Sequence, residues 1–170
     1  MKMIFRTLLT LALFGLAVVR LPADEIPTGN RPAPALTFKD VATGAKVSLA
    51  DLKGKVVVVD FWATWCEPCK TEIPGYIALQ EKYGKDGLVI IGVSLDQAGL
   101  KVVKKFAKEH GVNYTLVMGE TDDLDALTGK PGADIVIPTT FLIGRDGKLV
   151  HAKRGAMPHA EYEALVQRAL

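Results

Sequence analysis

Hydrophobic and polar positions along this chain of 170 residues alternate with the periods of short buried strands and amphipathic helices. Residues 56–59 are consecutive valines, and such a β-branched run is typical of a strand buried on both faces of a sheet. Residues 73–83 carry apolar side chains at three- and four-residue spacings and predict a helix that ends at Gly84. Because a second apolar run follows at residues 88–93, the order strand, helix, strand predicts a right-handed parallel crossover.

The second half of the chain contains further helix and strand patterns. Residues 100–110 place apolar side chains on one helix face and lysines on the other, and this pattern ends at Gly111. We interpret the lysine face as solvated surface, with docking of an acidic partner as the alternative. The other predicted elements are a strand at 114–118, a short helix at 122–127, strands at 139–143 and 148–151 joined by a tight turn, and a closing helix at 158–169.

The first 23 residues have the pattern of an export signal. Lys2 and Arg6 give a positive start, and residues 8–19 are largely apolar. Twelve helical residues span only about 18 Å, whereas the hydrocarbon core of a membrane is about 30 Å thick. A cleaved signal peptide is therefore favoured, and a retained membrane anchor is the alternative. We expect a periplasmic or other extracytoplasmic location.

Residues 24–34 predict a linker, because they hold several prolines and a Gly-Asn pair with little apolar pattern. We expect one domain over residues 35–170, since 49% hydrophobic residues in a chain of this length supply one core. Its first elements should be a hairpin of residues 36–38 and 46–49. The net charge of +2 is too small to indicate a nucleic-acid partner.

Both cysteines, Cys66 and Cys69, lie where the valine-rich strand gives way to the helix. The first amides of a helix lack partners and its dipole favours negative charge, so a thiolate at Cys66 is stabilised and its pKa lowered. Pro68 is tolerated in this first turn. The spacing lets both sulfurs lie on one face of a turn and permits a disulfide. We predict that an exposed Cys66 attacks a substrate disulfide and that the deeper Cys69 resolves the mixed disulfide.

Other uses of the cysteine pair are less favoured. A structural disulfide is common in exported proteins, but so short a loop constrains little of the chain. A zinc site would need further ligands, and His110, His151 and His159 are scattered along the sequence. We assign no metal and no cofactor to the site, and copper held by the two thiolates is kept as an alternative.

The stretch at 60–70, Asp-Phe-Trp-Ala-Thr-Trp-Cys-Glu-Pro-Cys-Lys, resembles the active-site signature of the thioredoxin superfamily. Followed by Glu72 and Pro74, it is most similar to the exported TlpA/ResA-type, redoxin-like proteins. A second signature, Ile-Pro-Thr-Thr-Phe, lies downstream at 137–141, and the resemblance extends from Arg31 to the C-terminus. It implies an α/β thioredoxin fold: a central mixed sheet flanked by helices, with an N-terminal β-hairpin extension and a central strand–helix insert.

The resemblance also implies how substrate is bound. From the sequence alone a trans bond before Pro138 is the default, because few X-Pro bonds in folded proteins are cis. In thioredoxin-like proteins the matching proline is cis and faces the cysteine pair, which would leave the backbone of Ile137 free to bind an extended substrate chain. The other residues that we assign to substrate binding are Trp65, Glu67 and Pro68.

Two acids lie close to the pair in sequence. Asp60 matches the buried aspartate of thioredoxins that assists proton removal from the resolving cysteine, and burial would raise its pKa. Glu72 matches an active-site glutamate of the ResA-type proteins, although a solvated first-turn acid is the alternative. A chain with both acids departs from the ResA-type pattern, in which the strand position is not an aspartate. The sequence leaves open which acid serves Cys69, or whether the two share a proton.

These features predict an exported, monomeric thiol:disulfide oxidoreductase that acts as a protein-disulfide reductase. The resemblance implies electrons from a membrane-embedded thiol donor and a protein substrate with oxidised cysteines, such as the haem-attachment cysteines of cytochrome c maturation or copper-site cysteines. A peroxide-reducing redoxin is an alternative, but Ala63 and Val59 replace the hydroxyl residue and proline of that motif. A non-enzymatic copper-binding chaperone is the second alternative function.

Overall fold

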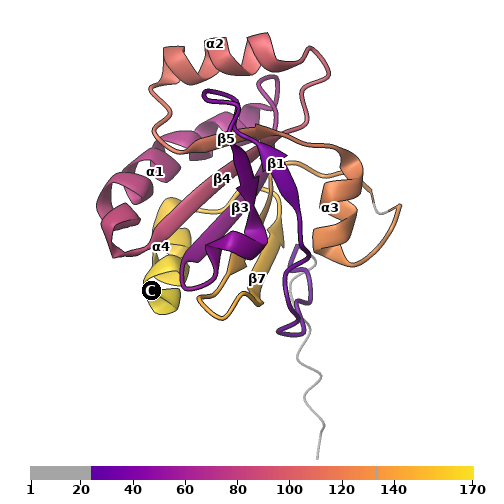
Figure 1. Ribbon diagram of the computed structural model, residues 1–170, viewed down its shortest axis with the longest axis vertical. Coiled ribbons are helices and arrows are strands. Elements are labelled where there is room, and N and C mark those ends of the chain that lie inside the picture. Colours follow the sequence, from indigo (N-terminus) through magenta and orange to yellow (C-terminus); the bar gives the residue numbers. More distant parts are fainter. Residues whose placement is uncertain (1–23, 133) are drawn as a thin grey trace, which may run out of the picture.

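The computed structural model describes residues 24–132 and 134–170, and Figure 1 shows its ribbon. The predicted export signal lies outside the described residues. The strands are β1 (Thr37–Lys39), β2 (Lys46–Ser48), β3 (Val56–Trp62), β4 (Leu88–Ser94), β5 (Thr115–Met118), β6 (Thr139–Ile143) and β7 (Leu149–Arg154). The helices are α1 (Glu67–Tyr83), α2 (Leu100–His110), α3 (Thr121–Thr128) and α4 (His159–Ala169), with short 3-10 turns η1 (Leu49–Leu52) and η2 (Gly84–Asp86). Within the described ranges, the structure contains no helix with the length and apolarity needed to cross a membrane.

The valine-rich strand β3 is the centre of a five-stranded sheet with the order β5-β4-β3-β6-β7. It pairs in parallel with β4 on one side and antiparallel with β6 on the other, so the sheet is mixed. Every residue of β3 is buried, as the continuous apolar run predicts for a strand covered on both faces. The predicted crossover is confirmed, because α1 connects the parallel strands β3 and β4.

The helices divide between the two faces of this sheet, as Figure 1 shows. Side chains alternate along β3, so Val56 and Val58 pack with α1 and α4, whereas Val57 and Val59 pack with α3 and the N-terminal segments. Helix α2 lies on the α1 face, where its Phe106 contacts the end of β3. The side of the molecule that carries α1 therefore has three helices, and this crowding encloses the region where β3 ends.

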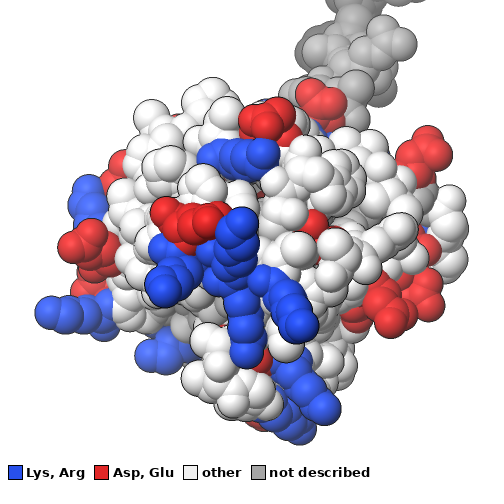
Figure 2. Space-filling view, turned by 90° about the horizontal axis from the view of Figure 1, so that it is seen from above, with Lys and Arg blue, Asp and Glu red and all other residues white. Residues whose placement is uncertain are grey.

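The other predicted elements are largely confirmed. Strands β1 and β2 form an antiparallel hairpin, and β5 and α3 lie where the sequence predicts a strand and a short helix. The strand predicted at 148–151 runs on to Arg154, because the polar end of β7 still pairs with β6. Figure 2 shows lysine and arginine side chains gathered at the end of the molecule that carries α2, whose exposed lysines are Lys101, Lys104, Lys105 and Lys108.

Residues 24–34, for which the sequence predicts a linker, run along the outer edge of β7. The amide of Ile26 donates to Ala152 O at 2.9 Å, and the amide of Ala33 donates to Gly147 O at 2.9 Å. Ile26 is only 5% exposed and belongs to the core on the α3 face. This segment therefore covers an edge of the sheet that would otherwise present unpaired backbone groups.

Replacing Ile26 tests whether this edge segment contributes to stability. Ile26→Ala should lower the free energy of unfolding by about 2 kcal/mol, because it leaves a cavity in the core. Val150→Ala on β7 is the matched control, since Val150 is 46% exposed. Urea denaturation of both variants measures the difference. Equal, small losses would mean that the segment is only loosely attached.

Candidate active site

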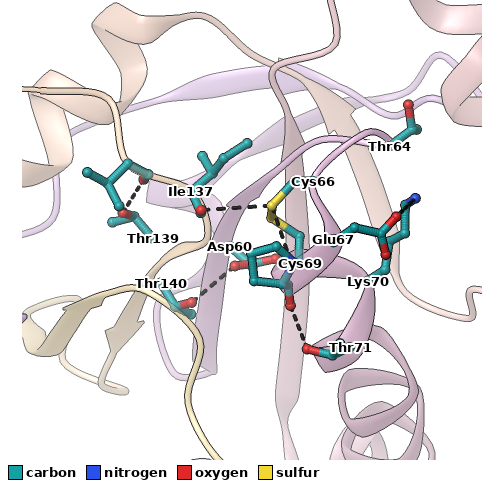
Figure 3. Close-up of a disulfide and its surroundings, with 12 residues drawn as sticks. Asp60, Thr64, Cys66, Glu67, Cys69, Lys70, Thr71, Ile137, Thr139 and Thr140 are labelled. Carbon is teal, nitrogen blue, oxygen red and sulfur yellow. Dashed lines mark hydrogen bonds and ion pairs between the residues drawn. A yellow bond between two sulfur atoms is a disulfide. The ribbon is translucent and has the colours of Figure 1, made fainter.

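The two cysteines sit at the start of α1, directly beyond the end of β3 (Figure 3). Cys66 is the N-cap residue, and the amide of Cys69 donates to Cys66 Sγ at 3.3 Å. The two sulfurs form a disulfide with an S–S distance of 2.03 Å. A sulfur at this position accepts a hydrogen bond from one of the helix amides that lack a backbone partner, and the helix dipole favours negative charge on it.

Cys66 is more buried than the sequence predicts, whereas Cys69 is buried as expected. Cys66 is only 4% exposed and Cys69 is 1% exposed, so the prediction of an exposed Cys66 is wrong. The reason is tertiary: the pair packs in one apolar cluster with Trp62 and Phe106. Trp65, immediately before Cys66, is instead 66% exposed and forms part of the surface above the disulfide.

The loop before β6 faces the disulfide. The Ile137–Pro138 peptide bond is cis, as the resemblance implies, and the carbonyl oxygen of Ile137 lies 3.8 Å from Cys66 Sγ. The hydroxyl of Thr139 donates to Val136 O at 2.6 Å and holds the loop in place. Ile135 and Val136 are 55% and 38% exposed. Together with Trp65 they give the surface around the disulfide an apolar character.

Asp60 lies inside the protein on the α1 face of β3. It is 3% exposed, and one carboxylate oxygen accepts a hydrogen bond from the Thr140 hydroxyl at 3.0 Å (Figure 3). The Tyr76 hydroxyl lies 3.2 Å from that of Thr140, so a chain of hydroxyl groups can run from α1 to the carboxylate. Burial raises the pKa of Asp60 well above its usual range, and the charge of Glu72 raises it further.

Glu72 is half-buried on α1, unlike a solvated first-turn acid. Its Oε1 accepts a hydrogen bond from the Met157 amide at 2.8 Å. Burial raises the pKa of Glu72 to about 7, although this hydrogen bond and the charge of Lys153 act in the opposite direction. The structure thus places both predicted acids close enough for the charge of Glu72 to act on Asp60.

Sequence reasoning missed Asp96. Its carboxylate is buried and accepts hydrogen bonds from the Thr64 amide at 2.9 Å and the Thr64 hydroxyl at 2.6 Å. The Ser94 hydroxyl donates to the same carboxylate at 2.8 Å. Asp96 therefore anchors the loop that precedes Cys66. A signal existed in the sequence: Thr64 and Asp96 each follow a buried strand, and the ends of adjacent parallel strands meet at one edge of a sheet.

The remaining predicted residues of the site lie at its surface. Glu67 and Pro68 are exposed, and Glu67 forms an ion pair with Lys70 at 2.7 Å, a type of surface contact that adds little stability. The three histidines have separate neighbours: His110 stacks on Phe106, His151 lies near Glu25, and His159 lies near Glu163. In the described part of the chain, no three His, Cys, Asp or Glu side chains are grouped as a metal site requires.

Comparisons with known proteins place the chain among redox proteins. Residues 30–152 match the sequence profile of the AhpC/TSA family. The chain is 42% identical to thiol-disulfide oxidoreductase ResA of Bacillus subtilis (strain 168) over 137 residues, which are 79% of this chain and 71% of ResA. A thiol:disulfide interchange protein of the thioredoxin family from Chlorobium tepidum TLS superposes with a TM-score of 0.74 at 32% identity, covering 82% of this chain and 96% of that one. StoA of Bacillus subtilis superposes with a TM-score of 0.61 at 26% identity, covering 78% of this chain and 98% of the StoA chain.

The fold and the disulfide at the start of α1 define a thiol-disulfide oxidoreductase with the thioredoxin fold. The similarity to ResA agrees with the sequence resemblance. The chain belongs to the AhpC/TSA family and, within it, to the ResA-type thiol-disulfide oxidoreductases.

The raised pKa of Glu72 predicts how stability depends on pH. In the unfolded chain this carboxyl ionises near its usual pKa of 4.5, whereas in the folded protein it ionises near 7. The folded state therefore binds more protons between these values, and stability should fall as the pH rises from about 4.5 to about 7. The raised pKa of Asp60 also makes the folded protein less stable as the pH rises. Glu72→Gln should make this fall shallower.

The measurement is urea denaturation of the oxidised protein at about pH 5 and about pH 8. Glu81→Gln, which removes an exposed acid from the same helix, is the control and should keep the wild-type fall. An unchanged pH dependence in Glu72→Gln would contradict the assignment of a protonated Glu72 in the folded state.

Proposed function

We propose that this protein is an exported reductase of protein disulfides that works through a dithiol/disulfide cycle of Cys66 and Cys69. The observation that carries the proposal is the disulfide at the N-cap of α1, with the Cys69 amide directed at Cys66 Sγ. That amide stabilises negative charge on Cys66 when Cys66 is the attacking thiolate.

The cycle balances as two exchange steps. The Cys66 thiolate attacks one sulfur of a substrate disulfide, and the other substrate sulfur leaves as a thiolate. Cys69 then loses its proton and attacks Cys66 Sγ, which releases the second substrate sulfur. The substrate gains two electrons and the protein becomes the disulfide seen here. A dithiol donor, which we place in the membrane, reverses these steps and restores the reduced protein.

Proton transfer at Cys69 is assigned to the two acids. A thiol near neutral pH ionises more readily when a nearby base has a pKa close to the ambient pH, and Glu72, with its pKa at about 7, fits this requirement. Asp60 is wholly buried and linked through Thr140 to Tyr76. We propose that Asp60 and Glu72 serve Cys69 as a coupled pair that holds one proton between them.

Substrate binding is assigned to the surface around the disulfide. We propose that an extended segment of the substrate forms backbone hydrogen bonds with Ile137, beside cis-Pro138. The exposed Trp65 would contact apolar side chains of that segment, and Glu67 and Pro68 would border it. Such a surface suits a partly unfolded polypeptide, in which the oxidised cysteines are accessible.

The positively charged and then apolar N-terminal sequence supports a setting outside the cytosol. We propose a periplasmic or other extracytoplasmic monomer whose protein substrates carry oxidised cysteines, as in cytochrome c maturation or copper-site assembly. The similarity to thiol-disulfide oxidoreductase ResA supports the exchange chemistry. Peroxide reduction is less favoured, because the buried Ala63 offers no hydroxyl group near Cys66.

A trapping experiment tests the roles of the two cysteines. Reduced Cys69→Ser, mixed with a disulfide-bonded peptide, should accumulate a covalent adduct on Cys66, because no resolving thiol is present. Cys66→Ser should form its adduct at least about ten-fold more slowly, because Cys69 is the more buried thiol and does not occupy the N-cap. Mass spectrometry of the products over time measures both rates.

Three results would contradict the proposal, one from this experiment and two from parallel assays with hydrogen peroxide and with copper. Equal adduct formation by the two variants would remove the distinction between attacking and resolving cysteine. Rapid consumption of hydrogen peroxide by the reduced wild type, with no reaction toward the peptide, would favour the peroxide-reducing alternative. Copper binding that blocks both reactions would instead favour a chaperone.

A further inference from the structure

A pocket between α1 and α4 opens beside Glu72. It has a volume of about 240 Å³ and is lined by Thr71, Glu72, Gly75, Tyr76, Met157, Pro158, His159 and Tyr162. The two helices lie side by side in Figure 1 and share one apolar cluster. Thr71, Pro158 and His159 at the rim are exposed, whereas Tyr76 and Tyr162 are buried. The pocket therefore leads from solvent to the interior beside the proposed acids.

Two polar atoms at this pocket are buried without a partner. Glu72 Oε2 and the Tyr162 hydroxyl are buried, and neither has a hydrogen-bond partner among the described residues. Tyr162 as a whole is only 3% exposed. Leaving such groups unpaired is costly, and polar pockets large enough for a water molecule hold waters that satisfy them. Both atoms belong to residues that line the same space.

We propose that the pocket holds an ordered water that bridges Glu72 Oε2 and the Tyr162 hydroxyl, and that it is the path by which protons pass between Glu72 and solvent. Tyr162 is a positioning residue in this scheme: it orients the water and does not touch the sulfurs. The role rests on the proposed function, whereas the bridging water can be tested independently of it.

The path completes the proton balance of the resolving step. When Cys69 attacks Cys66, its proton passes to the coupled pair of Asp60 and Glu72. Asp60 has no direct access to solvent, because it is wholly buried beneath α1 and bonded to Thr140. Glu72 can pass the proton from Oε2 to the bridging water, which releases one to the waters at the rim. Reduction of the disulfide uses the same path inward.

Several elements packed against Glu72 contribute ionisable or polar groups that act on its carboxyl. Asp60 on β3 and Lys153 on β7 act on it electrostatically, and the Met157 amide holds its Oε1. The other ionisable side chains that line the pocket are Tyr76, His159 and Tyr162. Because Oε1 is already held by the Met157 amide, Oε2 is the oxygen left to exchange a proton with the pocket.

Tyr162→Phe is the test, because it removes the hydroxyl and keeps the ring. The reduced protein is mixed with an aromatic disulfide that releases a coloured thiolate twice, first on attack by Cys66 and then on attack by Cys69. The variant should slow the second release about five-fold, the effect of losing one hydrogen bond, and leave the first unchanged. The matched control is Tyr83→Phe, whose hydroxyl bonds Glu163 and Gln167 outside the pocket and should change neither release.

Structure provides the second readout. A high-resolution crystal structure of the oxidised protein should show a water within hydrogen-bond distance of both Glu72 Oε2 and the Tyr162 hydroxyl, and Tyr162→Phe should displace it. A dry pocket, or a second release as fast as in the wild type, would overturn the inference. Failure of the first release would count against Cys66 as nucleophile, and hence against the proposed function, without bearing on the water.

Discussion

The site depends on how the first turn of α1 is held over the end of β3. The helix begins at Glu67 with Cys66 as its cap, so the Cys69 amide reaches Cys66 Sγ at 3.3 Å. Pairing of β3 with β4 and β6 sets the position of that turn, and the carboxylate of Asp96 ties the intervening loop to the end of β4 through Thr64. The same pairing brings the cis-proline loop against the disulfide. A shift of this turn would separate the sulfurs from the cis-proline loop and from the loop that Asp96 anchors.

The second constraint is the low polarity beneath that turn. Asp60 shares the interior with Tyr76 and Thr140, and Glu72 lies at the boundary between this interior and the α1–α4 pocket. Burial raises the pKa of both carboxyls, and their mutual repulsion opposes the ionisation of both at once. An acid pair with these properties can accept a thiol proton near neutral pH. Two isolated, solvated carboxylates would be poor bases at that pH.

Much of this arrangement could be predicted from the sequence, because it depends on local patterns. The valines of β3, the N-terminal hairpin and helix α2 follow from periodicity, and the cis bond before Pro138 follows from the family resemblance. The missing parts are long-range contacts. Cys66 is buried in a cluster that includes residues of α2, and the bond between Glu72 and the Met157 amide joins residues 85 positions apart. The edge segment at 24–34 has too few apolar residues to show a strand pattern, and its place is set by backbone bonds to β7.

The equilibrium reduction potential of the Cys66–Cys69 pair tests the central claim most directly. The protein would be equilibrated with a series of thiol/disulfide buffers, and tryptophan fluorescence would report the fraction reduced, since Trp65 adjoins the disulfide. A reductase requires a potential near that of thioredoxin, about −270 mV. A potential near about −120 mV, typical of a strong oxidant, would contradict the account, because electrons would then flow from substrate thiols into the disulfide.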